Sequence, residues 1–112
     1  MVEVITTDEF AAWYHGLDER DGETVDRVVG RLEVEGIRLG FPHSSAIEGS
    51  RLPLRELRAP GRPIRIFYAF DPNRDAVLLI GGDKTGDDRF YERMTPMAER
   101  IWSEYLREVF HR

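Results

Sequence analysis

Apolar residues near the start of the chain recur at intervals of three and four, which predicts a helix. The residues in this pattern are Phe10, Trp13, Tyr14 and Leu17. We expect the helix to follow a short strand over residues 2–5 and to end near Leu17. Thr6 fits the N-cap position and Glu9 completes a capping box, because these side chains accept hydrogen bonds from free backbone N–H groups.

A second stretch with the helical period follows and extends to Glu35. Its apolar residues are Val25, Val28, Val29 and Leu32. We expect this helix to begin at Asp21 or Glu23, and Gly36 is placed to end it. The two helices together are expected to form an N-terminal hairpin.

The period changes to two after a polar loop at residues 40–50, and this period predicts strands. Three strands are expected, over residues 52–59, 64–70 and 76–82. Residues 60–61 (Pro-Gly) and 71–74 (Asp-Pro-Asn-Arg) are turn sequences, so the strands should form an antiparallel meander. Residues 76–80 are continuously apolar, which predicts a strand buried on both faces, and the glycines at 81–82 are expected to break it.

The end of the chain predicts one more amphipathic helix. Thr95 would be its N-cap, with Pro96 at the first helical position. Its apolar stripe consists of Ala98, Ile101, Trp102, Tyr105 and Val109. The order β-α-α-β-β-β-α over residues 1–112 predicts a single α+β domain, with the helical hairpin and the C-terminal helix packed on one face of a small, mostly antiparallel sheet.

Composition narrows the class of protein. An apolar content of 41% and a charged content of 33% are typical of a globular domain. No window reaches the ~20 apolar residues of a membrane span, and the first residues lack a signal-peptide pattern. The chain contains no cysteine, which excludes disulfide and thiolate chemistry. We therefore expect a cytoplasmic protein.

The charge is unevenly distributed along the chain. The formal net charge is −5, yet residues 51–74 hold six arginines against two acids, Glu56 and Asp71. The guanidinium group is permanently charged and binds phosphate in a fork geometry. The sequence thus predicts a cationic strip suited to phosphate within a formally acidic protein.

Strand alternation assigns these arginines to faces. Glu56 and Arg58 share one face of their strand, Arg55 lies on the other, and Arg65 shares a face with Phe67 on the next strand. If the helices cover one face, arginines on the other would form a basic floor for a nucleic acid backbone. Solvated arginines paired with acids would explain the same spacing.

The remaining motifs are weaker evidence for a functional site. Residues 81–86 resemble a phosphate-binding loop only superficially, because Asp83 stands where the motif needs a glycine before Lys84. Asp87 fits a metal ligand or, more commonly, an acid that stabilises a helix N-terminus. The histidines have no metal-ligand spacing: His15, His43 and His111. We expect no metal and no cofactor, and His43, in the polar loop, is the histidine suited to chemistry.

Several segments together resemble the RelE/ParE toxin superfamily, and most closely its HigB-like, phage-related branch. They are Leu54-Arg55-Glu56-Leu57-Arg58, Pro63-Ile64-Arg65-Ile66-Phe67-Tyr68, the Lys84 loop before a closing helix, and Phe41-Pro42-His43-Ser44, which is similar to a Leu-Pro-His-Ser stretch common in that branch. The resemblance covers the chain from about Phe41 onward. It implies a RelE-like fold and the toxin of a type II toxin–antitoxin system, acting as a ribosome-dependent, metal-independent mRNA endoribonuclease. In that reaction the 2′-hydroxyl attacks the adjacent phosphodiester.

The resemblance also implies roles for particular residues. Arg58 matches the arginine that holds the scissile phosphate, and Arg65 matches an arginine that shares this task. Lys84 matches a basic residue after the last strand, and Tyr91 a tyrosine that acts as acid, base or stacking partner. His43 is a further acid or base candidate. The additional RNA-binding candidates are Arg55, Arg62 and Arg89.

Two alternatives remain for the function. The chain could be a non-catalytic member that acts by binding, as the gyrase inhibitors of this superfamily do, or a decayed member that binds only its antitoxin. The expected partners are a cognate helix-turn-helix antitoxin, the ribosome and mRNA. No membrane is expected as a partner, and no sequence-specific DNA binding by this chain alone.

Overall fold

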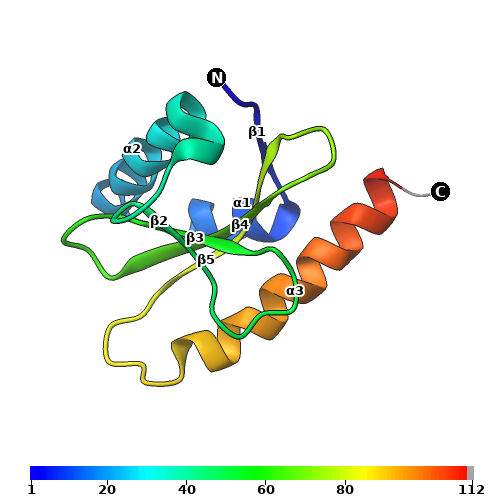
Figure 1. The fold of residues 1–112 in the computed structure, drawn as a ribbon. Coiled ribbons are helices and arrows are strands. Elements are labelled where there is room, and N and C mark those ends of the chain that lie inside the picture. Colours follow the sequence, from blue (N-terminus) through cyan, green and yellow to red (C-terminus); the bar gives the residue numbers. More distant parts are fainter. Residues whose placement is uncertain (111–112) are drawn as a thin grey trace.

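The computed structural model describes residues 1–110, which form three α-helices and one five-stranded sheet (Figure 1). The elements are β1 (Val4–Thr6), α1 (Asp8–His15), α2 (Glu19–Glu35), the 3-10 helix η1 (Gly36–Arg38), β2 (Ser44–Ala46), β3 (Arg55–Arg58), β4 (Ile64–Phe70), β5 (Ala76–Asp83) and α3 (Phe90–Val109). The strand order is β1-β5-β4-β3-β2, with β1 parallel to β5 and the other pairs antiparallel. The predicted α+β class and mostly antiparallel sheet are confirmed.

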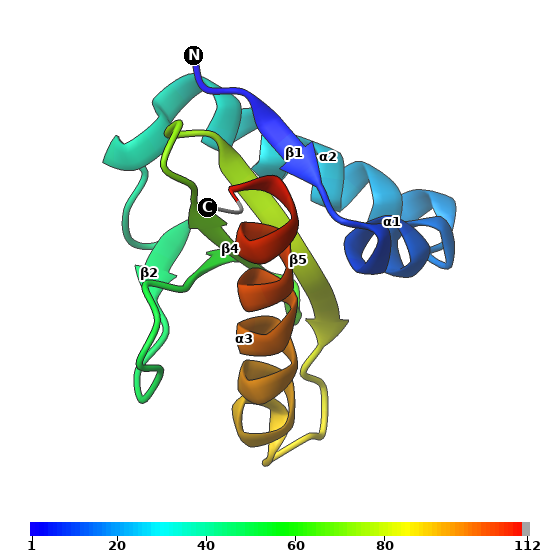
Figure 2. The same ribbon diagram turned by 90° about the vertical axis from the view of Figure 1, so that its right-hand side faces the viewer.

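Helices cover both faces of the sheet, so the expectation that they share one face is wrong. Figures 1 and 2 show α2 and α3 on opposite sides of the strands. The reason lies in β4, where Ile64, Ile66 and Tyr68 face the core with α1 and α2, while Phe67 and Ala69 face the core with α3. Because both sets are apolar, burying them requires a helix on each side.

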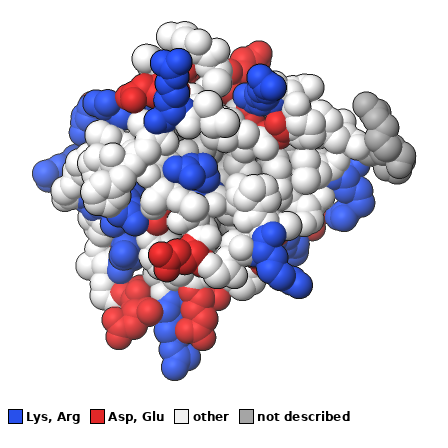
Figure 3. All heavy atoms as spheres, viewed as in Figure 1, with Lys and Arg blue, Asp and Glu red and all other residues white. Residues whose placement is uncertain are grey.

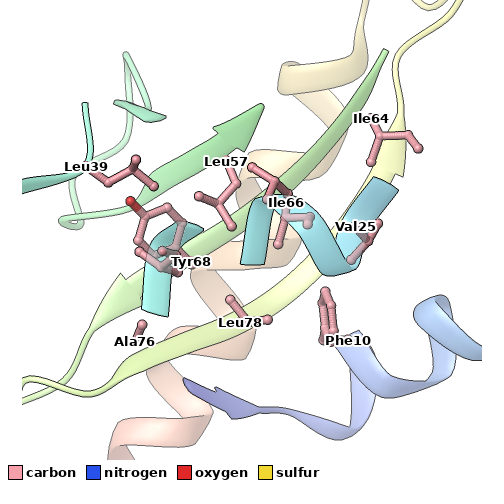
Figure 4. Packing of buried hydrophobic residues seen from close by; sticks show 11 residues of the cluster. Phe10, Val25, Leu39, Leu57, Ile64, Ile66, Tyr68, Ala76 and Leu78 are labelled. Atoms are coloured by element: carbon pink, nitrogen blue, oxygen red, sulfur yellow. The ribbon is translucent and has the colours of Figure 1, made fainter. Parts of the chain in front are cut away.

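The core on the side of α1 and α2 is the one drawn in Figure 4. Phe10 from α1 and Val25 from α2 lie there against Leu57, Ile66 and Leu78 of the strands. These five side chains are at most 4% exposed. Burial on this scale, at roughly 25 cal/mol per Å² of apolar surface, is what holds the hairpin on the sheet.

The first two helices begin at different residues from those expected. Thr7, not Thr6, caps α1, because its Oγ1 accepts a hydrogen bond from the N–H of Phe10 at 3.2 Å. Asp18 caps α2 in the same way and moves its start to Glu19. Gly36 ends α2 with a φ of 56°, as predicted.

The last helix begins at Phe90, so the expected start at Thr95 is wrong and Pro96 lies inside the helix. Phe90 and Met94 are buried and extend the apolar stripe one turn beyond the proline towards the N-terminus. Asp87 accepts a hydrogen bond from the N–H of Arg89 and supports this earlier start. Packing of the first turn therefore overrides the local signal of the proline.

Strand β5 passes through Gly81 and Gly82 to Asp83, so these glycines do not break it. A Cβ on Gly81 would lie 2.3 Å from the ring of Trp13, and a Cβ on Gly82 would lie 2.9 Å from the ring of Phe90. The two glycines allow an aromatic ring to approach each face of the strand.

The loop expected at residues 40–50 contains the short strand β2, which pairs with β3. Within residues 1–110, no helix combines the length and the apolar character needed to cross a bilayer.

Candidate functional site

The pairing of β3 with β4 places two arginines directly opposite each other. Arg58 is the register partner of Arg65, and Glu56 is the partner of Phe67. By alternation these side chains lie on the α3 face of the sheet, with Phe67 in its core. Like charges directly opposite each other destabilise a strand pair, so this arrangement requires a counter-charge.

Glu56 supplies that counter-charge and is itself almost completely buried. Its side chain is 5% exposed, against 33% for Arg58 and 16% for Arg65. Its Oε2 lies 3.2 Å from Nη2 of Arg58, and its Oε1 lies 3.7 Å from Nε of Arg65. The hydroxyl of Ser45 donates to Oε2 at 3.3 Å. A buried carboxylate is tolerated because several donors surround it.

Tyr91 of α3 completes this cluster. Its hydroxyl donates a hydrogen bond of 2.5 Å to Oε1 of Glu56. The ring packs between aromatic neighbours, with centroids 6.1 Å from Phe67 and 5.1 Å from Phe90. Burial raises the pKa of Tyr91 above 10.0, and the hydrogen bond and charge of Glu56 raise it further, against a lowering effect of Arg65. The hydroxyl therefore keeps its proton at neutral pH.

Lys84 reaches the cluster from the loop between β5 and α3. Its Nζ lies 5.1 Å from the centroid of the Tyr91 ring, a cation–π arrangement. Its backbone N–H donates to the carbonyl of Pro63 at 3.0 Å, which ties the loop to the start of β4. The neighbouring Asp83 carboxylate is engaged by Thr85, and this interaction lowers its pKa. Asp83 therefore remains a charged neighbour of Lys84.

We call Glu56, Arg58, Arg65, Lys84 and Tyr91 the arginine–tyrosine cluster. Within residues 1–110, the buried Nε atoms of Arg58 and Arg65 have no hydrogen-bond partner, as is also true of Nε of Arg62. An unsatisfied buried donor is costly, and the donors of Arg58 and Arg65 belong to charged guanidinium groups that attract anions. The cluster can therefore bind an oxyanion with two guanidinium groups while a protonated tyrosine lies beside it.

The other predicted site residues make their contacts elsewhere. Nε of Arg55 donates to Oγ of Ser44 at 3.2 Å and lies towards the opposite face of the sheet. Arg62 forms an ion pair with Asp21 of α2. Arg89 is exposed just before α3, two residues from Tyr91.

His43 is connected to the cluster through its backbone. Its carbonyl accepts a hydrogen bond of 2.8 Å from the N–H of Arg58. Its side chain lines a separate groove beneath α2, which Ala59 and Arg62 also line. The role of His43 as an acid or base stays a prediction.

Fewer arginines of the cationic strip, residues 51–74, are free to bind an anion than their number in the sequence suggests. Arg58 and Arg65 share Glu56, and Arg62 is paired with Asp21, so half of its six arginines have acidic neighbours. Figure 3 shows basic side chains along the left of one face and mixed charges at the bottom, where Figure 1 places the connection from β5 to α3. The face drawn there thus carries mixed charges and not one continuous basic surface.

Glu56 is the site residue that sequence reasoning did not select. The sequence does contain a sign of its importance, because Glu56 is the only acid in its strand, lies on the same face as Arg58 and directly follows Arg55. What the sequence did not show is its burial beneath Tyr91, which depends on α3 packing on that face.

The sequence has relatives among toxins of Mycobacterium tuberculosis. Residues 12–103 match the family described as Phage derived protein Gp49-like (DUF891). The predicted toxin HigB3 is 37% identical over 105 residues, which cover 92% of each chain. The predicted toxin HigB2 is 36% identical over 104 residues, and these cover 88% of this chain and 52% of HigB2, so the chain spans about half of that relative.

Solved structures share the fold at low sequence identity. The isolated RelE toxin of E. coli superposes with a TM-score of 0.64 at 9% identity, covering 87% of this chain and 99% of RelE. The toxin–antitoxin complex RelBE2 of M. tuberculosis gives a TM-score of 0.59 at 20% identity, covering 73% of this chain and 96% of the matched chain. The predicted RelE-like fold is therefore confirmed.

Proposed function

The chain belongs to the Gp49-like family of phage-derived proteins, and we propose from this membership that it is the toxin of a toxin–antitoxin pair and cleaves mRNA on the ribosome. The two predicted HigB toxins among its relatives support the toxin role. The observation that carries the nuclease activity is the convergence of Arg58, Arg65 and Tyr91 on one buried carboxylate, Glu56. The site of action is the cytoplasm, where ribosomes translate.

Cleavage would proceed by attack of the 2′-oxygen on the neighbouring phosphorus. The 2′-hydroxyl releases its proton to a water molecule, a bond forms between the 2′-oxygen and phosphorus, the bond from phosphorus to the 5′-oxygen breaks, and a 2′,3′-cyclic phosphate remains. Negative charge develops on the non-bridging oxygens, and the neighbouring guanidinium groups of Arg58 and Arg65 would stabilise it together. Nη1 of Arg65 already donates to the carbonyls of Arg62 and Ile64 at 3.0 Å, so Arg65 would act through its charge and its Nη2. Lys84 contributes a third positive charge beside Tyr91.

Tyr91 would donate its proton to the departing 5′-oxygen, for which its O–H turns from Glu56 to the RNA, and water would afterwards return a proton to the tyrosinate. Burial and Glu56 raise its pKa, so the phenol is protonated at the pH of the cell. The alkoxide that leaves the phosphorus is far more basic than a tyrosinate and accepts this proton. Glu56 fixes the hydroxyl by the 2.5 Å hydrogen bond, and it is too buried to contact RNA itself. Glu56 is therefore a positioning residue.

The partner of this toxin would be a cognate helix-turn-helix antitoxin. RelBE2, which shares the fold, is a toxin–antitoxin complex. The net charge of −5 disfavours direct binding of this chain to DNA. Operator binding would therefore reside in the antitoxin.

The proposal is tested by primer extension on mRNA in a reconstituted translation system. We expect cleavage by the wild type only when ribosomes are present. Arg58→Gln should lower the rate on the order of 10²–10³-fold, the loss typical of one oxyanion donor. The buried carboxylate of Glu56 keeps its hydrogen bonds from Tyr91 and Ser45 in this variant.

Arg74→Gln is the matched control, because Arg74 is exposed in the turn at the other end of β4. It should cleave like the wild type. Circular dichroism of both variants checks that the fold is retained. Cleavage by Arg58→Gln at the wild-type rate contradicts the assigned role, and a wild type that leaves ribosome-bound mRNA intact contradicts the nuclease activity.

A further inference from the structure

Phe41 is a large apolar side chain that the fold leaves in solvent. It is 80% exposed in the turn between η1 and β2. Backbone hydrogen bonds of 3.0 Å from His43 and Ser44 to the carbonyl of Gly40 close this turn, and Arg58 N–H anchors it to β3 through the carbonyl of His43. The ring is thus presented to solvent by a turn that is hydrogen-bonded on both sides.

The position of Phe41 connects it to the arginine–tyrosine cluster. The guanidinium carbon of Arg58 lies 5.7 Å from the centroid of the Phe41 ring. Arg58 is the residue that would hold the scissile phosphate, and its Nε is a buried donor without a partner. An aromatic face and a phosphate-binding group are therefore side by side.

We propose that Phe41 is a nucleobase-stacking platform, which receives the RNA base next to the phosphate held by Arg58. The inference rests on the proposed nuclease function and adds a base subsite to it. One side of the ring carries the guanidinium of Arg58, and its high exposure leaves room for a base to stack. Stacking of unpaired bases on aromatic side chains beside a cationic groove is the usual physics of single-strand recognition.

A protein partner is the competing occupant for this aromatic ring. Ile37 and Val34 are also exposed, at 81% and 65%, and a protein interface would bury them together with Phe41. The contact of Phe41 with Arg58 favours RNA, because it places the ring at the anion site. Ile37 therefore serves as the matched control, being as exposed as Phe41 and on the preceding 3-10 helix.

The test uses ribosomes programmed with mRNA that carries 2-aminopurine at one position of the decoding-site codon and 2′-O-methyl groups that prevent cleavage. Stacking quenches the fluorescence of 2-aminopurine. We expect wild-type toxin to quench it at one codon position, Phe41→Trp to do so at least as strongly, and Phe41→Leu to lose the quenching. Leucine keeps an apolar side chain but has no aromatic face. Phe41→Ala should weaken binding to these ribosomes about tenfold, the loss typical of one stacked base, while Ile37→Ala should bind as the wild type does.

The same preparations separate this inference from the function on which it rests. Cleavage of unmodified mRNA by the wild type establishes the nuclease independently of stacking. If the wild type cleaves but shows no quenching at any codon position, or if Phe41→Leu quenches fully, the platform is refuted and the nuclease stands. If Phe41→Ala and Ile37→Ala lower the affinity for a co-expressed antitoxin equally, and neither lowers the affinity for ribosomes, the Phe41 ring belongs to a protein interface and the platform is refuted. If the wild type does not cleave on ribosomes, the proposed function itself fails.

Discussion

At the scale of single residues, one buried carboxylate organises the site. Glu56 lies within 3.7 Å of groups from Arg58, Arg65 and Tyr91, and its negative charge offsets the repulsion between the two arginines. It also holds the proton on Tyr91, because a negative charge beside a phenol disfavours the phenolate. Glu56 thereby links the proposed phosphate-binding groups to the proposed proton donor.

Glu56→Gln should lower the pKa of Tyr91. The substitution removes the charge that raises this pKa, whereas burial, the largest cause of the raised value, persists. The pKa should therefore fall, and Tyr91 should ionise at lower pH than in the wild type. NMR titration of ring-labelled tyrosine, assigned with Tyr91→Phe, measures this shift.

Ser45→Ala is the control for this titration, because it removes one hydrogen bond to Glu56 and leaves its charge. It should leave the pKa of Tyr91 near the wild-type value. A Glu56→Gln variant whose Tyr91 titrates like that of the wild type would show that burial alone holds the proton.

At the scale of elements, the two helical layers pack against β5 through glycines. Trp13 of α1 lies against Gly81 and Phe90 of α3 lies against Gly82, on opposite faces of one strand. This packing continues β5 to Asp83, from which the Lys84 loop departs towards Tyr91. The glycines thus position the last two residues of the cluster.

Gly81→Ala should destabilise the protein by about 1–3 kcal/mol, the usual cost of overpacking a core. The added methyl would lie 2.3 Å from the rigid ring of Trp13. Gly30→Ala, in the middle of α2 with no atom within 4 Å of the new methyl, should stabilise by about 0.4–1 kcal/mol. Urea denaturation measures the free energy of unfolding of both variants. Equal values for the two variants would mean that α1 does not pack closely on β5.

The elements also show which parts of the structure the sequence reveals. Residues 64–70 were predicted with the bounds of β4, because alternating β-branched and aromatic residues leave little choice. The start of α3 was missed because Thr95 and Pro96 mimic a helix start, and only tertiary burial of Phe90 and Met94 reveals the earlier turn. Strand β2 was missed because its Ser-Ser-Ala sequence has no strand signal and depends on pairing with β3.

The sequence predicted some of the contacts in the candidate site and missed others. Arg58, Arg65, Lys84 and Tyr91 were selected from motif resemblance. The structure brings Arg58, Arg65 and Tyr91 together around Glu56, and it places Lys84 against the ring of Tyr91. The direction of Arg55 away from them followed from strand alternation alone. Strand alternation does not predict the ion pair of Arg62 with Asp21, because this pair depends on how α2 docks beside the turn after β3.

At the scale of the whole molecule, the proposed phosphate site is small and the net charge of the chain is −5. Binding to the ribosome should therefore depend on a few contacts near the cluster. Each neutralised phosphate contributes about −0.7 to the slope of log affinity against log salt for single strands, so three or four contacts give about −2 to −3.

Replacing Arg58 and Arg65 with glutamine should flatten this slope by about one to two units. Replacing Arg27 and Arg31 of α2 with glutamine should leave it unchanged, because Arg31 is already paired with Glu35 and both lie on α2 away from the cluster. Ribosome-binding titrations at several salt concentrations measure both slopes. Equal flattening by the two pairs would mean that net charge governs binding.

The nuclease activity is tested by sequencing RNA ends in cells after induction of the toxin. The wild type should produce new mRNA 5′ ends inside translated reading frames, each matched by an upstream fragment ending in a 2′,3′-cyclic phosphate. Arg58→Gln, at equal protein level, should produce neither these ends nor growth arrest. Growth arrest by the wild type without such ends would contradict the nuclease and would indicate inhibition by binding alone.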